Sequence, residues 1–388
     1  MSLSTEHWQK ITRGCAEIIS EADLKTKLEK DRPLRIKLGV DPTAPDLHLG
    51  HLVVLRKLKT FQELGHQIEF IIGDFTARIG DPSGQSATRP PLQPQQVWEH
   101  AKTYQDQVFQ VLDKEKTHVR FNSTWINALG MTGLLDLQRR ASVAQMLQRA
   151  DFSERYAEGR PISLLELVYP ILQGYDSVAI QADLELGGTD QKFNLLMGRE
   201  MQNDFHQEPQ VVMMMPLLEG LDGVRKMSKS YANYVAFNDS AKDQFGKLMS
   251  VPDALMPKYF ELLTDLDITP IKAMHPRDAK VLLAKTITAQ FHGADAAEAQ
   301  ASEFDRVFSK KEIPEDIPEF RTFRGTHPLV DVLTTANMAP SKKEARRLLM
   351  QGAVEVDGKR MNEKDFLDLQ APALIQVGKR RFVRVVPT

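Results

Sequence analysis

The sequence predicts an α/β protein built on a parallel β-sheet, and three observations support this fold class. Residues 35–40 and 68–72 are runs of strand length, one alternating and one largely apolar. Each run ends in a polar turn rich in glycine or proline, and segments with helical spacing follow. Strands that alternate with helices in this way predict βαβ units, whose ligands bind at the carboxyl ends of the strands. We therefore expect the functional residues in the turns after the strands.

The composition is typical of a soluble globular protein and excludes some kinds of site. The 388 residues are enough for two or three domains, with 42% hydrophobic and 26% charged residues. Cys15 is the only cysteine, so neither an internal disulfide nor a cysteine-based metal site is expected. The N-terminus has no signal-peptide core and no apolar run approaches membrane-spanning length, which predicts a cytoplasmic protein without membrane association.

The first strand leads into the stretch KLGVDPTAPDLHLGH, residues 37–51. Two prolines delay the following helix, which we expect over residues 47–62 with Asp46 as its N-cap. His48 and His51 then lie in its first turn, and Gly50 between them lets a ligand approach closely. A helix N-terminus of this kind favours anions, and nucleotide phosphate is the expected guest. Two surface histidines without a function are an equally good interpretation of this stretch alone.

The other elements of the first 230 residues continue the alternation of helices and strands. One amphipathic helix is predicted before the first strand, at residues 5–30. Further helices are predicted at 94–112, 134–156, 162–182 and from about 192, and further strands at 118–121, 184–186 and 211–218. Glycine-bearing polar turns follow two strands, at 73–84 and 187–191, and residues 85–91 are expected to be mobile, with one cation, Arg89. The turns after the first two strands, at 41–46 and 73–84, lack the dehydrogenase fingerprint G-x-G-x-x-G.

Two further groups of polar residues are candidates for a site. Tyr169, Gln173 and Asp176 fall on one face of the predicted helix 162–182, although Pro170 should kink that helix or mark its start. Buried polar groups need partners, so this face is either a binding surface or a structural hydrogen-bond network. A glycine-bearing loop at residues 219–230 carries Lys226 and Lys229, which could clamp a triphosphate or simply face solvent.

HLGH at 48–51 and KMSKS at 226–230 resemble the two signatures of class I aminoacyl-tRNA synthetases, the second letter for letter. GDPSG, YPILQGYD and GGTDQ between them resemble the tyrosyl-tRNA synthetases in particular, and the similarity covers essentially the whole chain. The resemblance implies a Rossmann-like catalytic domain at 1–225. It also implies the KMSKS loop with an α-helical anticodon-arm domain at 226–320, and a small α+β RNA-binding domain at 327–388 like that of a ribosomal small-subunit protein.

The resemblance also implies roles for matching residues. Catalytic contacts to the ATP phosphates are implied for Thr43, His48, His51, Lys226, Lys229 and Arg89, and further ATP contacts for Asp41, Gly50, Gly188, Asp190 and Met227. The implied tyrosine site comprises Lys37, Gly39, Thr76, Asp81, Tyr169, Gln173, Asp176 and Gln191. In it Asp81, Tyr169 and Gln173 would bind the ammonium group, Asp176 the phenol hydroxyl, and Gln191 the carboxylate region. Many family members have tyrosine where this chain has Lys37, which either pairs with Asp176 or points away.

The C-terminal third fits the same interpretation. Residues 236–309 are predicted to be mostly helical with a break at 268–277, and the proline-rich segment 310–328 to be a linker. Helices are then expected from 328 and after the N-cap Ser341, followed by short strands in 353–360 and 380–386. Residues 327–388 contain eleven Lys and Arg against seven Asp and Glu. The predicted tRNA contacts are Lys342, Lys343, Arg346 and Arg347, unless this is only a solvated basic face.

The expected function is the attachment of L-tyrosine to tRNA(Tyr), through tyrosyl-adenylate and then transfer to the 3′-terminal ribose. ATP is expected as a substrate with Mg²⁺, without a tightly bound cofactor or a protein metal site, and the resemblance implies a homodimer. Two alternatives remain open. One is a tryptophanyl-tRNA synthetase, which Asp176 and the basic tail disfavour, and the other is a catalytically idle RNA-binding relative, which the intact signatures disfavour.

Overall fold

The computed structural model describes residues 4–82, 93–308, 317–378 and 381–388. It divides into two compact units, residues 1–297 and 298–388. Arg89, a predicted phosphate contact, lies outside the described residues, as do the whole predicted mobile segment 85–91 and residues 310–316 of the predicted linker.

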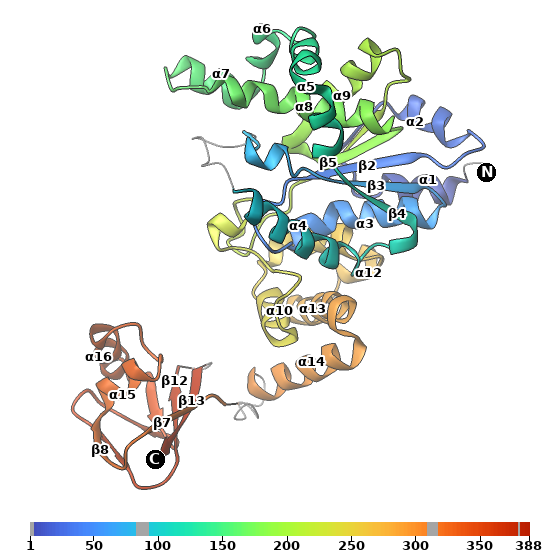
Figure 1. Ribbon diagram of the computed structural model, residues 1–388. Coiled ribbons are helices and arrows are strands. Elements are labelled where there is room, and N and C mark those ends of the chain that lie inside the picture. The colour runs from blue at the N-terminus through green and yellow to red at the C-terminus, as the bar shows by residue number, and fades with distance from the viewer. Residues whose placement is uncertain (1–3, 83–92, 309–316, 379–380) are drawn as a thin grey trace. The chain divides into compact units, whose positions relative to one another are not determined.

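A six-stranded sheet forms the centre of the first unit, with strand order β1-β6-β5-β2-β3-β4 (Figure 1). The strands are β1 (Glu17–Ile19), β2 (Arg35–Val40), β3 (Gln67–Ile72), β4 (Thr117–Phe121), β5 (Leu184–Gly188) and β6 (Val211–Met215). All pairings are parallel except that of β1 with β6. The order reverses between β2 and β5, the position where such sheets open a crevice for ligands. The predicted α/β class and the predicted strands are confirmed.

Helices cover both faces of this sheet (Figure 1). The helices in this part of the chain are α1 (Thr5–Thr12), α2 (Glu21–Leu28), α3 (Leu49–Glu63), α4 (Pro94–Val108), α5 (Ser123–Gln138), α6 (Val143–Met146), α7 (Ala150–Ala157), α8 (Leu164–Ile180) and α9 (Lys192–Asp204). The segment predicted as one helix at 134–156 is instead the end of α5 followed by α6 and α7. Pro170 lies inside α8 and neither ends the helix nor marks its start. The helix begins at the N-cap Ser163, whose capping box includes Glu166.

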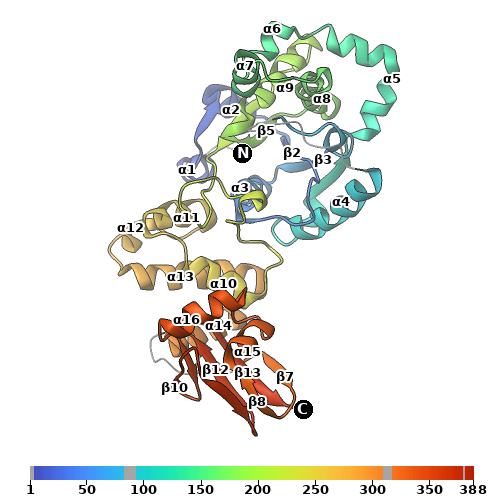
Figure 2. The same cartoon turned by 90° about the vertical axis from the view of Figure 1, so that its left-hand side faces the viewer.

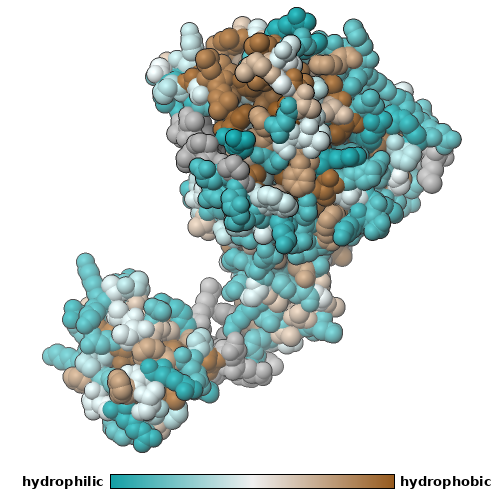
Figure 3. All heavy atoms as spheres, viewed as in Figure 1, coloured by the Kyte–Doolittle hydropathy of each residue, from teal (hydrophilic) through white to brown (hydrophobic). Residues whose placement is uncertain are grey.

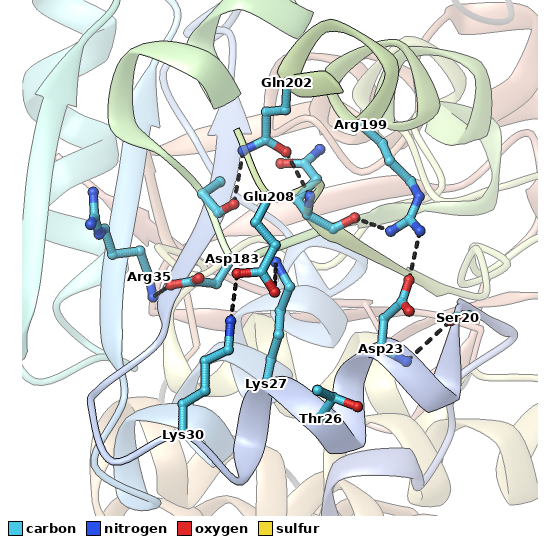
Figure 4. Close-up of polar contacts among 12 residues, drawn as sticks. Ser20, Asp23, Thr26, Lys27, Lys30, Arg35, Asp183, Arg199, Gln202 and Glu208 are labelled. Atoms are coloured by element: carbon cyan, nitrogen blue, oxygen red, sulfur yellow. Dashed lines mark hydrogen bonds and ion pairs between the residues drawn. The ribbon is translucent and has the colours of Figure 1, made fainter. Parts of the chain in front are cut away.

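The prediction of one helix over residues 5–30 is wrong. Gly14 adopts a left-handed backbone (φ 68°), and a Cβ there would lie 2.8 Å from a methyl group of Leu262, so the helix cannot continue. The chain then forms the edge strand β1 before α2 begins. Ion pairs hold α2 and the residues just after it on the body of the unit: Asp23 of α2 pairs with Arg199 at 2.6 Å, and Lys30, which follows α2, pairs with Glu208 at 2.5 Å (Figure 4).

The first unit ends in the predicted run of helices. These are α10 (Ala241–Met249), α11 (Met256–Leu263), α12 (Ile268–Ile271), α13 (Pro276–His292) and α14 (Ala294–Phe308), the last of which continues into the second unit. The short α12 occupies the predicted break. No helix among the described residues is long and apolar enough to cross a membrane.

The second unit is a small α+β domain (Figure 2). A five-stranded sheet has the order β10-β9-β12-β13-β7 and a two-stranded sheet pairs β11 with β8. Its elements are β7 (Glu319–Thr322), β8 (Gly325–Pro328), α15 (Leu329–Thr335), α16 (Lys342–Met350), β9 (Val354–Val356), β10 (Lys359–Arg360), β11 (Phe366–Leu369), β12 (Ala373–Val377) and β13 (Arg381–Pro387). The predicted linker is thus wrong over 319–328, because β7 and β8 pair with strands from the end of the chain. Ser341 caps α16 as predicted.

Candidate active site

A cavity of about 530 Å³ opens at the carboxyl ends of β2, β3 and β5. It is lined by most of the residues that the sequence nominated: Gly39, Asp41, Thr43, His48, Gly50, His51, Thr76, Asp81, Tyr169, Gln173, Asp176, Gly188, Asp190, Gln191, Lys226 and Met227. Lys37 and Lys229 do not line it. The turns after the strands therefore meet where a parallel sheet places its ligands.

His48 and His51 begin α3, and backbone hydrogen bonds fix both rings. Nδ1 of His48 accepts from the Gly50 N–H at 3.2 Å, and Nδ1 of His51 accepts from the His48 N–H at 3.2 Å. A neutral imidazole that accepts at Nδ1 carries its proton on Nε2. Burial lowers the pKa of His51 to about 4 and that of His48 well below its usual value, so both rings are neutral at pH 7. Each ring therefore has an Nε2–H to donate.

The predicted N-cap Asp46 is wrong, because His48 holds that position. The backbone around His48 is extended and pairs with a distant segment, so it does not form a helical turn. The N–H of Leu49 donates to Val235 at 3.0 Å, the N–H of Phe237 donates to Leu47 at 3.0 Å, and His48 pairs with Ala236. This long-range pairing delays α3 until Leu49.

Asp41 follows β2, is partly buried, and accepts hydrogen bonds from two other residues of the site. Thr76 donates its hydroxyl to Asp41 at 2.7 Å, and Tyr169 donates its phenol hydroxyl at 2.9 Å. Burial raises the pKa of Asp41 to about 7, although these two hydrogen bonds oppose the shift. The carboxylate thus orients Thr76 and Tyr169 at the wall of the cavity.

Asp176 on α8 is held by two residues that the sequence reasoning missed. The indole N–H of Trp125 donates to Oδ1 at 2.8 Å, and the amide of Asn122 donates to Oδ2 at 3.4 Å. Burial raises the pKa of Asp176 to about 6, while the charge of Lys37 and both donors lower it. Asn122 directly follows β4, and this place after the carboxyl end of a strand is the one sequence signal that could have identified it. Each Asp176 oxygen has a second lone pair for a ligand.

Lys37 is fully buried and pairs with Glu185 rather than with Asp176. Its ammonium lies 2.9 Å from Glu185 and donates to the Ser177 hydroxyl at 2.7 Å and to the Gln173 carbonyl at 3.0 Å. Lys37 and Glu185 are register partners across β2 and β5. The lysine therefore supports α8 from behind the cavity and reaches Asp176 only through its charge.

The KMSKS segment lies at the mouth of the cavity. The Lys226 ammonium pairs with Asp190 at 2.9 Å. Burial lowers the pKa of Lys229, whose ammonium has no hydrogen-bond partner within the described part of the chain. The buried Asn233, also missed from sequence, anchors the segment: it accepts from the Ser228 N–H at 2.8 Å and donates to the Lys226 carbonyl at 3.2 Å.

The predicted RNA-binding cations are exposed on α16 of the second unit. Lys342 pairs with Asp331 at 2.7 Å and Arg347 pairs with Glu344 at 2.6 Å. Exposed pairs of this kind contribute little stability, so they are readily exchanged for a phosphate. No cluster of three or more His, Cys, Asp or Glu side chains suited to a metal ion occurs among the residues that the structure describes.

Two family models match consecutive parts of the chain. The model of the class I tRNA synthetases (W and Y) matches residues 29–309, and that of the SYY-like tyrosine–tRNA ligase C-terminal domain matches residues 310–382. Tyrosine–tRNA ligase of Aromatoleum aromaticum is 52% identical, with 97% of each chain covered. The enzyme of Moorella thermoacetica is 50% identical, covering 97% of this chain and 94% of the relative.

Solved structures support the fold. A C-terminally truncated mitochondrial tyrosyl-tRNA synthetase of Aspergillus nidulans has a TM-score of 0.65 at 21% identity, covering 78% of this chain and 93% of the other. The tyrosyl-tRNA synthetase of Archaeoglobus fulgidus, solved with L-tyrosine, has a TM-score of 0.62 at 21% identity, covering 76% and 99%. With near-complete coverage at about half identity, this chain belongs to the class I tRNA synthetases, in the tyrosine–tRNA ligase family.

Proposed function

We propose that this chain attaches L-tyrosine to tRNA(Tyr), first forming tyrosyl-adenylate from ATP and then transferring the tyrosyl group to the 3′-terminal ribose. The observation that carries the proposal is the buried Asp176 at the cavity wall, an acceptor with unused lone pairs for a phenol hydroxyl. Leaving such an acceptor without a partner is costly, so it favours tyrosine over an apolar ring.

The amino end of tyrosine would bind where the cavity offers acceptors. Asp81 lines it, and Oε1 of Gln173 is buried with no hydrogen-bond partner among the described residues. An ammonium group has three donors and would satisfy both. Tyr169 and Thr76 would complete this subsite, Gly39 would form its floor, and Gln191 would face the carboxylate.

ATP would bind at the start of α3. The Nε2–H groups of His48 and His51 would donate to phosphate oxygens together with Thr43, while Gly50 leaves room for the nucleotide. Gly188 and Asp190 would contact the ribose, with Asp41 and Met227 near the nucleotide. ATP would enter as its Mg²⁺ complex, as substrate, and no tightly bound cofactor is proposed.

Catalysis then needs no protein nucleophile. The tyrosine carboxylate attacks the α-phosphorus in line, the bond to pyrophosphate breaks, and negative charge grows on the leaving oxygens. Lys226, Lys229 and Arg89 would stabilise that charge, and binding both substrates in one cavity supplies the orientation.

The second unit would bind tRNA through Lys342, Lys343, Arg346 and Arg347. We assign residues 1–225 to catalysis, 226–320 to the KMSKS loop and the anticodon-arm helices, and 327–388 to RNA binding. The family match at 310–382 supports an RNA-related role for the last segment. A cytoplasmic location is proposed because aminoacylation serves translation.

A homodimer is proposed from exposed apolar side chains on α5, α6, α7 and the start of α8. These are Met131, Leu135, Val143, Tyr156, Leu164 and Leu165, all more than half exposed. Hydrophobic residues gather over this end of the first unit (Figure 3). Contiguous exposed apolar surface of this kind marks a protein interface.

ATP–pyrophosphate exchange against single amino acids tests the proposal. Tyrosine should support exchange and tryptophan should not. Exchange with tryptophan alone would favour the tryptophan branch, and no exchange with any amino acid would indicate an RNA-binding relative without catalysis.

A further inference from the structure

A closed ring of four side chains lies beside the cavity, and two of its members do not line it. Arg149, the N-cap of α7, donates to the Asn194 oxygen at 3.0 Å. The Asn194 amide donates to the Gln191 oxygen at 3.0 Å, and the Gln191 amide donates to Asp81 at 2.8 Å. The ring closes with Arg149 at 3.6 Å from Asp81. Only Asp81 and Gln191 reach the cavity.

The two ends of this chain of hydrogen bonds fix the direction of every bond in it. A guanidinium group can only donate and an ionised carboxylate can only accept. Arg149 therefore requires the oxygen of Asn194, which leaves its NH₂ for Gln191. Gln191 must then accept with its oxygen and direct its own NH₂ toward Asp81 and the cavity. Arg149 thus decides, through Asn194, which end of the Gln191 amide faces the ligand.

Burial stabilises this orientation of the Gln191 amide. The Arg149 and Asn194 side chains are almost completely buried, so water cannot readily replace a lost partner. Arg149 is also held by Asp151, at 2.8 Å from Nε. A flipped Gln191 would turn its oxygen toward Asp81 and toward an incoming carboxylate, and both contacts are repulsive.

We propose that Arg149 and Asn194 are positioning residues that orient Gln191 to donate to the carboxylate of the amino-acid substrate. The inference rests on the proposed function, since it concerns the same tyrosine subsite. It adds a discrimination that Asp176 cannot provide: the site distinguishes tyrosine from an amine with the same ring and no carboxylate.

Tyramine, which has the phenol and the ammonium but no carboxylate, is the probe. The measurement is the ratio of the dissociation constants of L-tyrosine and tyramine for the full chain, by calorimetry. In Asn194→Asp the new carboxylate keeps Arg149 paired but cannot donate to Gln191, so the Gln191 amide should turn. The preference for tyrosine should fall about tenfold or more, as for loss of one hydrogen bond to a charged group.

A double-mutant cycle separates this relay from the added negative charge. In a Gln191→Ala background, Asn194→Asp should leave the preference unchanged, because the residue it acts through is gone. An equal effect in both backgrounds would overturn the relay and indicate direct repulsion. An unchanged preference in the single variant would overturn it as well.

Two further variants exclude a merely structural explanation. Arg149→Lys should restore part of the preference relative to Arg149→Met, because the ammonium can still donate to Asn194. Arg155→Gln removes another buried arginine of α7, paired with Glu166, and should lower stability without changing the preference. An equal loss of affinity for both ligands in Asn194→Asp would contradict the relay. Failure of the unmodified chain to bind tyrosine would instead contradict the proposed function.

Discussion

Replacing Lys37 with methionine should destabilise the first unit strongly. The side chains of Lys37 and Glu185 are 0% and 1% exposed, so the substitution leaves a carboxylate buried without its counter-ion. Ser177 at 3.1 Å and Gln210 still donate to Glu185, but neutral donors do not replace the charge. Breaking a buried pair in this way typically costs about 3–5 kcal/mol, a large part of the usual ~5–15 kcal/mol of a folded protein.

Urea unfolding followed by tryptophan fluorescence measures this loss in the right unit, because Trp8, Trp98 and Trp125 all lie in it. The matched control is Lys37→Met with Glu185→Gln, which removes both charges and should recover most of the stability. A cost below about 1 kcal/mol for the single variant, or no recovery in the double variant, would refute the reasoning.

Four further outcomes are expected. Asp176→Ala should reduce the tyrosine-over-phenylalanine ratio in pyrophosphate exchange at least ~tenfold, whereas Lys37→Ala should change that ratio modestly. A larger loss in Lys37→Ala than in Asp176→Ala would mean that Lys37, and not Asp176, recognises the phenol hydroxyl. Lys229→Ala should lower kcat for exchange on the order of 10²-fold with little change in KM for tyrosine, and an unchanged rate would remove the loop from the mechanism. Burial raises the pKa of Asp176 to about 6, so kcat/KM for tyrosine should fall as the pH drops through 6. The stability that the protonated form contributes is lost as the pH rises from about 4 through 6. If the pH profile of kcat/KM were the same in Asp176→Asn, its acid limb would belong to another group. A chain ending at Phe308 should retain exchange, because the cavity lies in the first unit, but should charge tRNA poorly and bind it with a shallower salt dependence; full charging would make the second unit dispensable.

Local pattern predicted most of the catalytic framework. The runs at 35–40 and 68–72 became β2 and β3 because strands buried in a parallel sheet are largely apolar and end where polar turns begin. The sequence also predicted the helix that begins at Lys192 and the N-cap Ser341, since the start of a helix depends on neighbouring residues. Elements whose signal spans a few residues are therefore within reach of sequence reasoning.

The failures share a different cause, which is pairing across long stretches of chain. His48 rather than Asp46 caps α3 because residues near 236 hold the preceding chain extended. The linker at 319–328 became β7 and β8 because β13 and β11 lie beside them. In the same way Trp125 and Asn194 belong to no local motif. Trp125 contacts Asp176, 51 residues further along the chain, and Asn194 contacts Arg149, 45 residues before it.

The three-residue strand β1 has a consequence for solubility. β6 reads VVMMM and is entirely buried, an apolar stretch without charge or proline. At the rim of a sheet such a stretch would offer a row of free N–H and C=O groups to strands of other molecules. β1 occupies that row by antiparallel pairing, from Glu17 opposite Met214 to Ile19 opposite Val212. β1, which lies in a segment that the sequence predicted as one helix, therefore shields β6 from pairing with strands of other molecules.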